Sequence, residues 1–267
     1  MTTRFRIRVD GAVLAGERRE GDGPPLVLVH GFGGSRRDWD PLAAALPAAF
    51  PLIAYDQRGF GESTAQGLAY SHADDLLALL DALEIVEVDL CGMSLGGATA
   101  LNFALDHPER VRRLVLVSPL MVGWTWTSDW IERWKAIGRA ARAGEMARAR
   151  DLWWHHPLFD ALRETPAAAA MQAAIQAYHG DQWVLDPQRP ALPDSERLGA
   201  LSMPTLLLTG GRDTPDFRMI AEAIAAKGQD VTRIDHDGAG HMLNLEIPGR
   251  IAAEIRDFLA HPRTPQT

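Results

Sequence analysis

The chain has 267 residues and a single cysteine, Cys91, so no disulfide can form within it. This cysteine and the nine histidines show no spacing typical of a structural zinc site. Both absences exclude disulfide-rich and zinc-ribbon architectures. We expect the protein to work in a reducing compartment.

Long apolar runs and an excess of positive charge are also absent. No segment of about 18 consecutive apolar residues occurs, which excludes a transmembrane helix. Residues 1–10 lack the apolar core and the small-residue cleavage site of a signal peptide. With 27 basic and 35 acidic side chains, the formal net charge of -8 repels nucleic acid and anionic membranes. We expect a cytoplasmic protein with neither nucleic acid nor membrane as a partner.

The chain instead alternates short apolar runs with stretches of helical periodicity. The near-continuous hydrophobicity of the runs is typical of parallel strands buried on both faces. Together they predict an α/β fold with a mostly parallel central sheet covered by helices on both faces. The predicted strands are residues 26–29, 52–55, 86–91, 114–117, 206–209 and 231–234, with an antiparallel edge hairpin at 4–9 and 13–19. The predicted helices are residues 71–83, 95–105, 217–227 and 248–259.

The alternation stops near residue 119 and resumes near residue 203. The segment between is rich in Ala, Arg and Trp, and its alanine-rich run at 167–174 indicates a helix that Pro166 can open. We therefore predict a core in two parts, residues 1–119 and 202–267, with a helical cap at 120–201 and a frayed end at 261–267. The cap holds seven of the eight tryptophans: Trp124, Trp126, Trp130, Trp134, Trp153, Trp154 and Trp183.

The sharpest motif is Gly-Met-Ser-Leu-Gly at residues 92–96, between a predicted strand and a predicted helix. This context is the one that a Gly-x-Ser-x-Gly nucleophile elbow requires. The turn holds Ser94 in a strained conformation at a helix N-terminus, where the free N–H groups favour developing negative charge. A serine N-cap on a glycine-rich turn is the purely structural alternative.

Two further segments support the elbow: His-Gly-Phe-Gly-Gly at residues 30–34 and Asp-Gln-Arg-Gly-Phe-Gly-Glu-Ser at residues 56–63. With them the chain resembles the α/β-hydrolase superfamily over essentially its whole length outside the cap. The resemblance implies an α/β-hydrolase fold and an oxyanion hole formed by the backbone N–H groups of Phe32 and Leu95. The second segment carries no chemistry and is expected to tie down its loop.

A serine nucleophile needs a base and an acid that orients the base. His241 ends a Gly-Ala-Gly-His segment before the last predicted helix, where members of the superfamily carry the catalytic histidine. Asp213 follows the strand at 206–209 at the position of the orienting acid, and Asp216 is the second choice. The order Ser94, Asp213, His241 is the one expected of α/β-hydrolases.

The resemblance implies a serine hydrolase that cleaves a small carboxylic ester or lactone through an acyl-enzyme at Ser94, with no metal and no cofactor. Related haloalkane dehalogenases and epoxide hydrolases carry Asp in place of Ser94. Small esterases, lactonases such as the 3-oxoadipate enol-lactonase group, and perhydrolases are the most similar. Carbon–carbon hydrolases commonly have Trp after the histidine, where this chain has Met242. Carbon–carbon hydrolysis, perhydrolysis and a non-catalytic ligand receptor remain as alternatives.

Substrate choice belongs to the cap, whose aromatic content favours an apolar or aromatic-bearing substrate. The spacing by four of Trp126, Trp130 and Trp134 also fits docking of a cap helix on the core, which we favour for most of them. The sequence leaves the natural substrate, cap movement and oligomeric state open, a homodimer included. The candidate pocket residues are Trp126, Trp130, Trp153, Trp154 and Met242.

Overall fold

The computed structural model of the protein describes residues 2–67 and 69–260. Its centre is one eight-stranded sheet in the order β1-β2-β4-β3-β5-β6-β7-β8. Strand β2 runs antiparallel to β1 and β4, and all other neighbours are parallel. The predicted mostly parallel sheet and its edge hairpin are therefore confirmed. The frayed end expected at 261–267 lies outside the described residues. The strands are β1 Thr2–Val9, β2 Ala12–Arg19, β3 Leu26–Val29, β4 Leu52–Tyr55, β5 Val88–Met93, β6 Val111–Val117, β7 Thr205–Gly210 and β8 Val231–His236.

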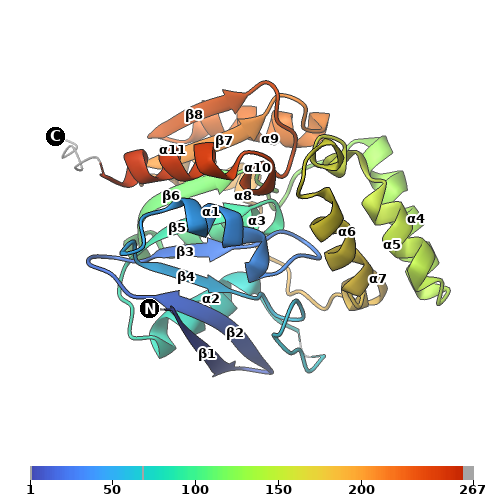
Figure 1. Ribbon diagram of the computed structural model, residues 1–267, viewed down its shortest axis with the longest axis horizontal. Helices are drawn as coiled ribbons and strands as arrows, with labels where there is room; N and C mark the ends of the chain where they lie inside the picture. The colour runs from blue at the N-terminus through green and yellow to red at the C-terminus, as the bar shows by residue number, and fades with distance from the viewer. Residues whose placement is uncertain (1, 68, 261–267) are drawn as a thin grey trace.

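Helices cover both faces of the sheet because successive strand residues point to opposite sides. Leu26 and Leu28 of β3 pack in the cluster that includes α1 and α11, whereas Val27 and Val29 pack in the cluster of α2, α3 and α9. Figure 1 shows α1 and α11 in front of the sheet. The helices of the core are α1 Asp40–Ala45, α2 His72–Ala82, α3 Leu95–Asp106, α9 Pro215–Lys227, α10 Leu243–Glu246 and α11 Pro248–Ala260.

One predicted strand is displaced. The apolar run at 86–91 predicts a strand that begins at Val86, but β5 begins at Val88 and continues to Met93. Val86 is 79% exposed, and its carbonyl accepts a hydrogen bond from Arg110 Nε at 2.7 Å. Val86 therefore belongs to the loop that enters the sheet. The strand ends directly before Ser94.

The segment between β6 and β7 is helical, and Figure 1 shows α4, α5, α6 and α7 grouped beyond one end of the sheet. We propose residues 120–201 as the cap. The expected alanine-rich helix is α6, which begins two residues after Pro166. Among the described residues no helix is long and apolar enough to cross a membrane. The cap helices are α4 Ser128–Arg142, α5 Met146–Trp154, α6 Ala168–Ala177, α7 Asp181–Val184 and α8 Asp194–Arg197. Short 3-10 helices lie at Arg36–Trp39, Pro108–Arg110, Pro157–Phe159, Leu162–Glu164 and Leu198–Ala200.

Candidate active site

The turn from β5 into α3 holds Ser94 in a strained conformation. Its φ of 54° and ψ of -116° lie in a region that non-glycine residues rarely adopt, at a cost of about 1–3 kcal/mol. The Ser94 N–H donates to the carbonyl of Val117 at 3.1 Å, and the Ser94 carbonyl accepts from the N–H of Leu120 at 2.9 Å. One bond to the last residue of β6 and one to the loop after it thus fix the turn, as expected of a nucleophile elbow.

The glycines of the motif are required by close backbone approach. A Cβ on Gly96 would lie 2.1 Å from the carbonyl oxygen of Val29, and a Cβ on Gly92 would lie 2.1 Å from that of Gly96. Both distances are far below van der Waals contact. Any side chain at either position would push α3 away from the sheet and displace Ser94.

His241 and Asp213 form a buried pair. Nδ1 of His241 lies 2.8 Å from Oδ2 of Asp213, and each side chain is only 2% exposed. The other carboxylate oxygen of Asp213 accepts the N–H of Thr214 at 2.6 Å. A carboxylate only accepts, so the pair places the imidazole proton on Nδ1 and leaves the lone pair on Nε2. The Nε2 atom has no hydrogen-bond partner within the described chain.

Asp216, the second choice for the acid, lies elsewhere in the hydrogen-bond network. Its carboxylate accepts from Trp124 Nε1 at 3.1 Å, from the N–H of Thr127 at 3.0 Å and from Thr127 Oγ1 at 2.6 Å. All three donors belong to the segment that enters the cap. The structure therefore brings Asp213, and not Asp216, to His241.

Ser94 and His241 border the same small cavity of about 20 Å³, together with Met242 and the loop at 30–34. A space of this size is close to that of one water-sized probe. The nucleophile and base candidates, which follow β5 and β8 in the chain, therefore line one cavity at the carboxyl ends of the strands. This edge of the sheet is where ligands of open α/β folds bind.

The predicted oxyanion donors belong to Phe32 and Leu95, which line the same cavity as Ser94. Leu95 is the first residue of α3, and Gly31 is so near that a Cβ on it would lie 3.4 Å from Ser94 Cβ. Neither N–H finds an acceptor among residues 2–67 and 69–260. The role of both N–H groups as oxyanion donors stays a prediction, and neither group is used by another hydrogen bond in the described chain.

His30 orients the Phe32 N–H. Its Nε2 accepts the N–H of Gln57 at 2.9 Å, so the proton of the neutral ring lies on Nδ1, which donates to the carbonyl of Gly31 at 2.7 Å. Burial lowers the pKa of His30 and favours this neutral form. The carbonyl and N–H of a trans peptide point in opposite directions, so the bond to Gly31 turns the Phe32 N–H away from His30.

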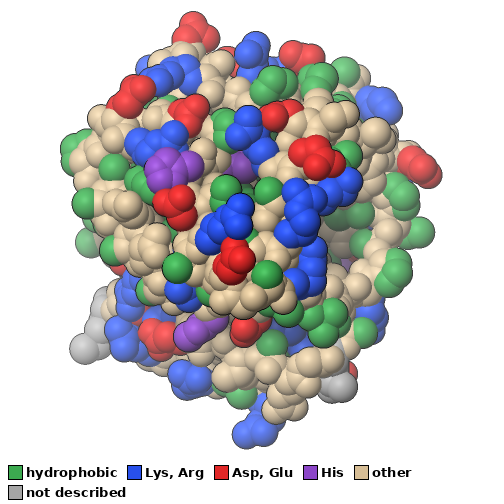
Figure 2. Space-filling view, turned by 90° about the vertical axis from the view of Figure 1, so that its right-hand side faces the viewer, with side chains coloured by type: hydrophobic (Ala, Val, Ile, Leu, Met, Phe, Trp, Pro, Cys, Tyr) green, Lys and Arg blue, Asp and Glu red, His purple; other side chains and the backbone are tan. Residues whose placement is uncertain are grey.

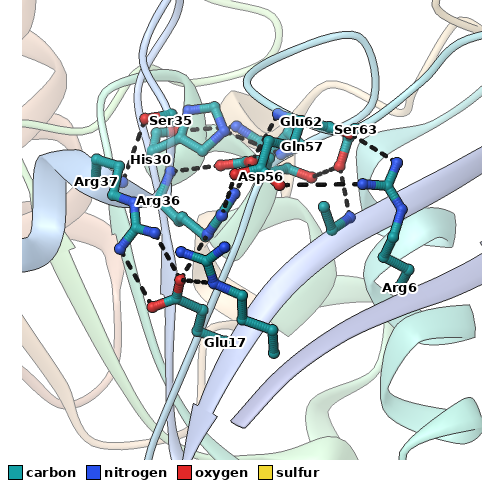
Figure 3. A network of polar contacts seen from close by, with 12 residues as sticks. Arg6, Glu17, His30, Ser35, Arg36, Arg37, Asp56, Gln57, Glu62 and Ser63 are labelled. Carbon is teal, nitrogen blue, oxygen red and sulfur yellow. Dashed lines mark hydrogen bonds and ion pairs between the residues drawn. The ribbon is translucent and has the colours of Figure 1, made fainter. Parts of the chain in front are cut away.

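The loop after β4 is held by the polar network of Figure 3. Asp56, which is fully buried, accepts from the Arg36 backbone N–H at 2.7 Å and forms an ion pair with its guanidinium. Arg36 also pairs with Glu62 at 2.6 Å, and Ser63 Oγ donates to the carbonyl of Asp56 at 2.6 Å. These contacts fasten the loop at 56–63 to itself and to the 3-10 helix at Arg36–Trp39, which agrees with the structural role expected for it.

Asp38 and His156 are titratable groups near the site with strongly shifted pKa values. Burial raises the pKa of Asp38, which borders the small cavity, to about 7, although its carboxylate accepts the N–H of Ser35 at 3.2 Å. Burial lowers the pKa of His156 in the cap to about 4. The described part of the chain contains no cluster of three or more His, Cys, Asp or Glu side chains that could hold a metal ion.

A larger cavity of about 520 Å³ extends from Ser94 beneath the cap. Trp126 and Trp130 stack with ring centroids 4.3 Å apart, and both contact Phe217 at 5.7 and 5.5 Å. Phe217 in turn packs against the ring of His241 at 4.3 Å. A continuous aromatic wall therefore joins the base candidate to the cap. The aromatic residues of this cavity are Phe32, Trp126, Trp130, Trp134, Trp153 and Phe217.

The predicted pocket residues do not all reach this cavity. Met242 borders only the small cavity, and Trp154 borders neither. Trp154 instead packs against Phe159, with the Arg163 guanidinium 5.8 Å from its ring. Neighbouring helix positions point about 100° apart, so Trp153 and Trp154 face different surroundings. The assignment of Trp154 to the pocket stays a prediction that the lining of these two cavities does not support.

Sequence reasoning also missed several lining residues. Trp134, assigned mainly to docking, lines the cavity together with Trp126 and Trp130. These three tryptophans therefore both dock the cap helix on the core and line the cavity. Phe217 and His72 were not foreseen, although Phe217 lies four residues after the predicted acid. Its position directly after a conspicuous Asp-containing loop was the available signal.

Charged side chains at the cavity are already paired. Figure 2 shows Lys and Arg side chains gathered beside a recess in the cap-side face. Of the residues that line the cavity, Lys135 lies 3.1 Å from Glu132, and Arg189 forms an ion pair with Asp74. The apolar wall, rather than a free cation, is therefore the dominant feature of this cavity.

Comparison with known proteins agrees with this geometry. Residues 24–248 match the family model described as alpha/beta hydrolase fold. The dihydrolipoyllysine-residue acetyltransferase component of the acetoin cleaving system of Pseudomonas putida is 33% identical over 249 residues, which are 89% of this chain and 64% of that protein. This chain thus spans about two thirds of that relative's length.

Two further proteins are similar over nearly their whole length. The 2-hydroxymuconate semialdehyde hydrolase of Pseudomonas sp. strain CF600 is 30% identical over 256 residues, covering 90% of this chain and 88% of that protein. A solved structure of a thermophilic esterase from Thermogutta terrifontis is 27% identical with a TM-score of 0.76, covering 96% of this chain and 98% of the esterase.

Proposed function

The chain belongs to the α/β-hydrolase fold family, and on that premise we propose that it is a serine hydrolase that cleaves a small carboxylic ester or lactone through an acyl-enzyme at Ser94. The observation that carries the proposal is the buried pair of His241 and Asp213: Nε2 of His241 has no partner in the described chain, and His241 borders the same small cavity as Ser94. A strained elbow and a buried base with a fixed tautomer have no evident packing purpose.

The first half of the reaction acylates Ser94. Its Oγ attacks the ester carbonyl carbon while Nε2 of His241 takes the hydroxyl proton. The new C–O bond places negative charge on the former carbonyl oxygen, which the N–H groups of Phe32 and Leu95 would bind. Asp213 stabilises the imidazolium that forms. Collapse breaks the bond to the alcohol oxygen, which receives the proton from Nε2, and the alcohol leaves.

The second half repeats these steps with water. His241 takes a proton from water as its oxygen attacks the acyl carbon, and the same two N–H groups bind the second oxyanion. Collapse breaks the bond to Ser94 Oγ, which regains its proton from Nε2, and the carboxylic acid is released. A lactone follows the same route, except that the leaving hydroxyl stays attached to the product.

A second candidate is hydrolysis of a carbon–carbon bond on the same residues. The similarity to 2-hydroxymuconate semialdehyde hydrolase supports tests with unsaturated semialdehydes. Perhydrolysis needs the same acyl-enzyme, which hydrogen peroxide attacks in place of water to release a peracid. A ligand receptor would bind an ester in the 520 Å³ cavity without releasing acid.

The test compares p-nitrophenyl acetate hydrolysis by the wild-type protein and by Ser94→Ala. We expect turnover by the wild type and a loss of about 10³-fold or more in the variant, because the residual catalysis of such a site comes from the oxyanion donors alone. Activity that survives the substitution would exclude Ser94 as nucleophile. A folded wild type that binds esters without turning them over would favour the receptor.

A further inference from the structure

Asp216 connects the cap to the core through three hydrogen bonds. It is the second residue of α9, lies three positions after Asp213 and is 3% exposed. Trp124 Nε1, the Thr127 N–H and Thr127 Oγ1 all donate to its carboxylate, at 3.1, 3.0 and 2.6 Å. Hydrogen bonds to a buried charge are among the stronger polar contacts in proteins.

Thr127 is the residue that begins the main cap helix. It is the N-cap of α4, and its hydroxyl oxygen also accepts the N–H of Trp130 at 3.5 Å. Trp126, Trp130 and Trp134 line the cavity from this helix or from the residue just before Thr127. The position of Asp216 therefore fixes where the aromatic wall stands relative to Ser94.

An ion pair also joins the cap to this part of the core, but it is much more exposed than the hydrogen bonds of Asp216. Arg212 pairs with Glu164 at 2.7 Å, but their side chains are 42% and 63% exposed. Solvent screens such a pair, and its contribution is small. Asp216 is thus the stronger polar anchor of the two, and it lies beside Phe217, which contacts Trp126, Trp130 and His241.

We infer that Asp216 is a positioning residue that holds the tryptophans of the cap over Ser94 and thereby selects esters that carry an aromatic ring. This inference rests on the proposed serine hydrolysis. An added ring would pack against Trp126, Trp130 and Phe217, whereas an ethyl or acetyl group would barely reach them. Loss of the hydrogen bonds of Asp216 should raise KM for ring-bearing esters. Any fall in kcat for small esters should be by a smaller factor.

The test uses three esters followed by acid release: ethyl acetate, ethyl 3-phenylpropionate with the ring in the acyl group, and 2-phenylethyl acetate with the ring in the alcohol. In the wild type we expect kcat/KM for at least one ring-bearing ester to exceed that for ethyl acetate about tenfold. In Asp216→Ala this advantage should fall to about twofold, mostly through KM. Asp216→Asn keeps an oxygen for two of the three donors and should retain most of the preference.

Trp124→Phe is the second variant, and it keeps the inference testable if Asp216→Ala fails to fold. It removes one hydrogen-bond donor to Asp216 and keeps an aromatic ring at position 124. It should reduce the same preference about threefold. The matched control is Asp129→Asn on the outer face of α4, where the ion pair to Arg133 is exposed. We expect no change in ring preference for this control.

A binding measurement separates this inference from the proposed reaction. Calorimetry of 3-phenylpropionate with Ser94→Ala protein needs no turnover, and adding Asp216→Ala should weaken its Kd about tenfold. A wild type inert towards all esters but with this Kd difference would reject the hydrolase and keep the positioning role. In an active wild type, the absence of a ring preference, equal losses for all three esters or an unchanged ring preference in both variants would overturn the inference. In an inert wild type, an unchanged Kd for 3-phenylpropionate would overturn it.

Discussion

His241 Nδ1 lies 2.8 Å from Oδ2 of Asp213, with both side chains 2% exposed. The contact fixes the imidazole tautomer with the proton on Nδ1. An amide in place of the carboxylate can donate to Nδ1, which moves the ring proton to Nε2 and gives the opposite tautomer. We expect Asp213→Asn to lower kcat for p-nitrophenyl acetate about 10³- to 10⁴-fold with a small change in KM.

The comparison variant is Asp216→Asn, which alters the neighbouring carboxylate that binds the cap. Its kcat for the same ester should exceed that of Asp213→Asn by at least about 100-fold. Equal losses in the two variants would contradict the assignment of Asp213 as the orienting acid.

Glu246 holds the loop that carries His241. Its carboxylate accepts the N–H of Gly240 at 2.6 Å and the N–H of Met242 at 2.9 Å, so it binds the residues on both sides of the histidine. Glu246→Gln replaces one acceptor oxygen by a donor that faces a backbone N–H. We expect kcat to fall about 10- to 100-fold, since small misplacements of a base are costly.

Steady-state kinetics with ethyl acetate measures this loss. Glu222→Gln, an exposed glutamate on α9, is the control and should leave kcat unchanged. A Glu246→Gln variant with wild-type kcat would show that the loop keeps its shape without the two hydrogen bonds of the carboxylate.

The buried carboxyl of Asp38 makes stability depend on pH. Burial raises its pKa to about 7 in the folded protein, whereas the unfolded value is about 3.9. The folded state therefore holds the proton more tightly, and the free energy of unfolding falls as pH rises from about 4 to about 7. Below this window the stabilisation is fully present, and above it the stabilisation is lost.

Asp38→Asn removes this dependence and keeps an oxygen for the Ser35 N–H. We expect the variant to exceed the wild type in free energy of unfolding by about 2–4 kcal/mol at pH 8, and by almost nothing at pH 4. Urea unfolding at the two pH values measures the difference. A difference that does not change with pH would show that Asp38 does not titrate in this range.

Gly96 is required for the approach of α3 to β3. An added Cβ would lie 2.1 Å from the carbonyl oxygen of Val29, which is backbone and cannot move aside cheaply. We expect Gly96→Ala to lower the free energy of unfolding by about 1–3 kcal/mol. Gly199→Ala is the control, because nothing lies within 4 Å of a Cβ there. Similar urea midpoints for the two variants would contradict the close packing at the elbow.

Much of the core could be predicted because its signals are local. Continuous apolar runs mark buried parallel strands, and the elbow motif specifies a strand, a strained serine and a helix in one short segment. The displaced start of β5 shows the limit of this reasoning. Val86 is as apolar as Val88, and only the three-dimensional path of the chain leaves it exposed.

The roles of the cap residues were harder to predict because they depend on contacts with residues distant in sequence. Trp153 and Trp154 are identical in type, yet only Trp153 faces the cavity. The role of Asp216 depends on Trp124 and Thr127, about 90 residues earlier in the chain, and no spacing pattern connects them. Sequence alone placed Asp216 near the acid without showing that it binds the cap.

The most direct test of the central claim is covalent labelling of the protein by a fluorophosphonate, followed by mass spectrometry of its peptides. An activated serine displaces fluoride from the probe, whereas an ordinary hydroxyl does not react. The account predicts one adduct, located on Ser94, that disappears in Ser94→Ala and forms far more slowly in His241→Ala. Labelling at another residue, or equal labelling in His241→Ala, would contradict it.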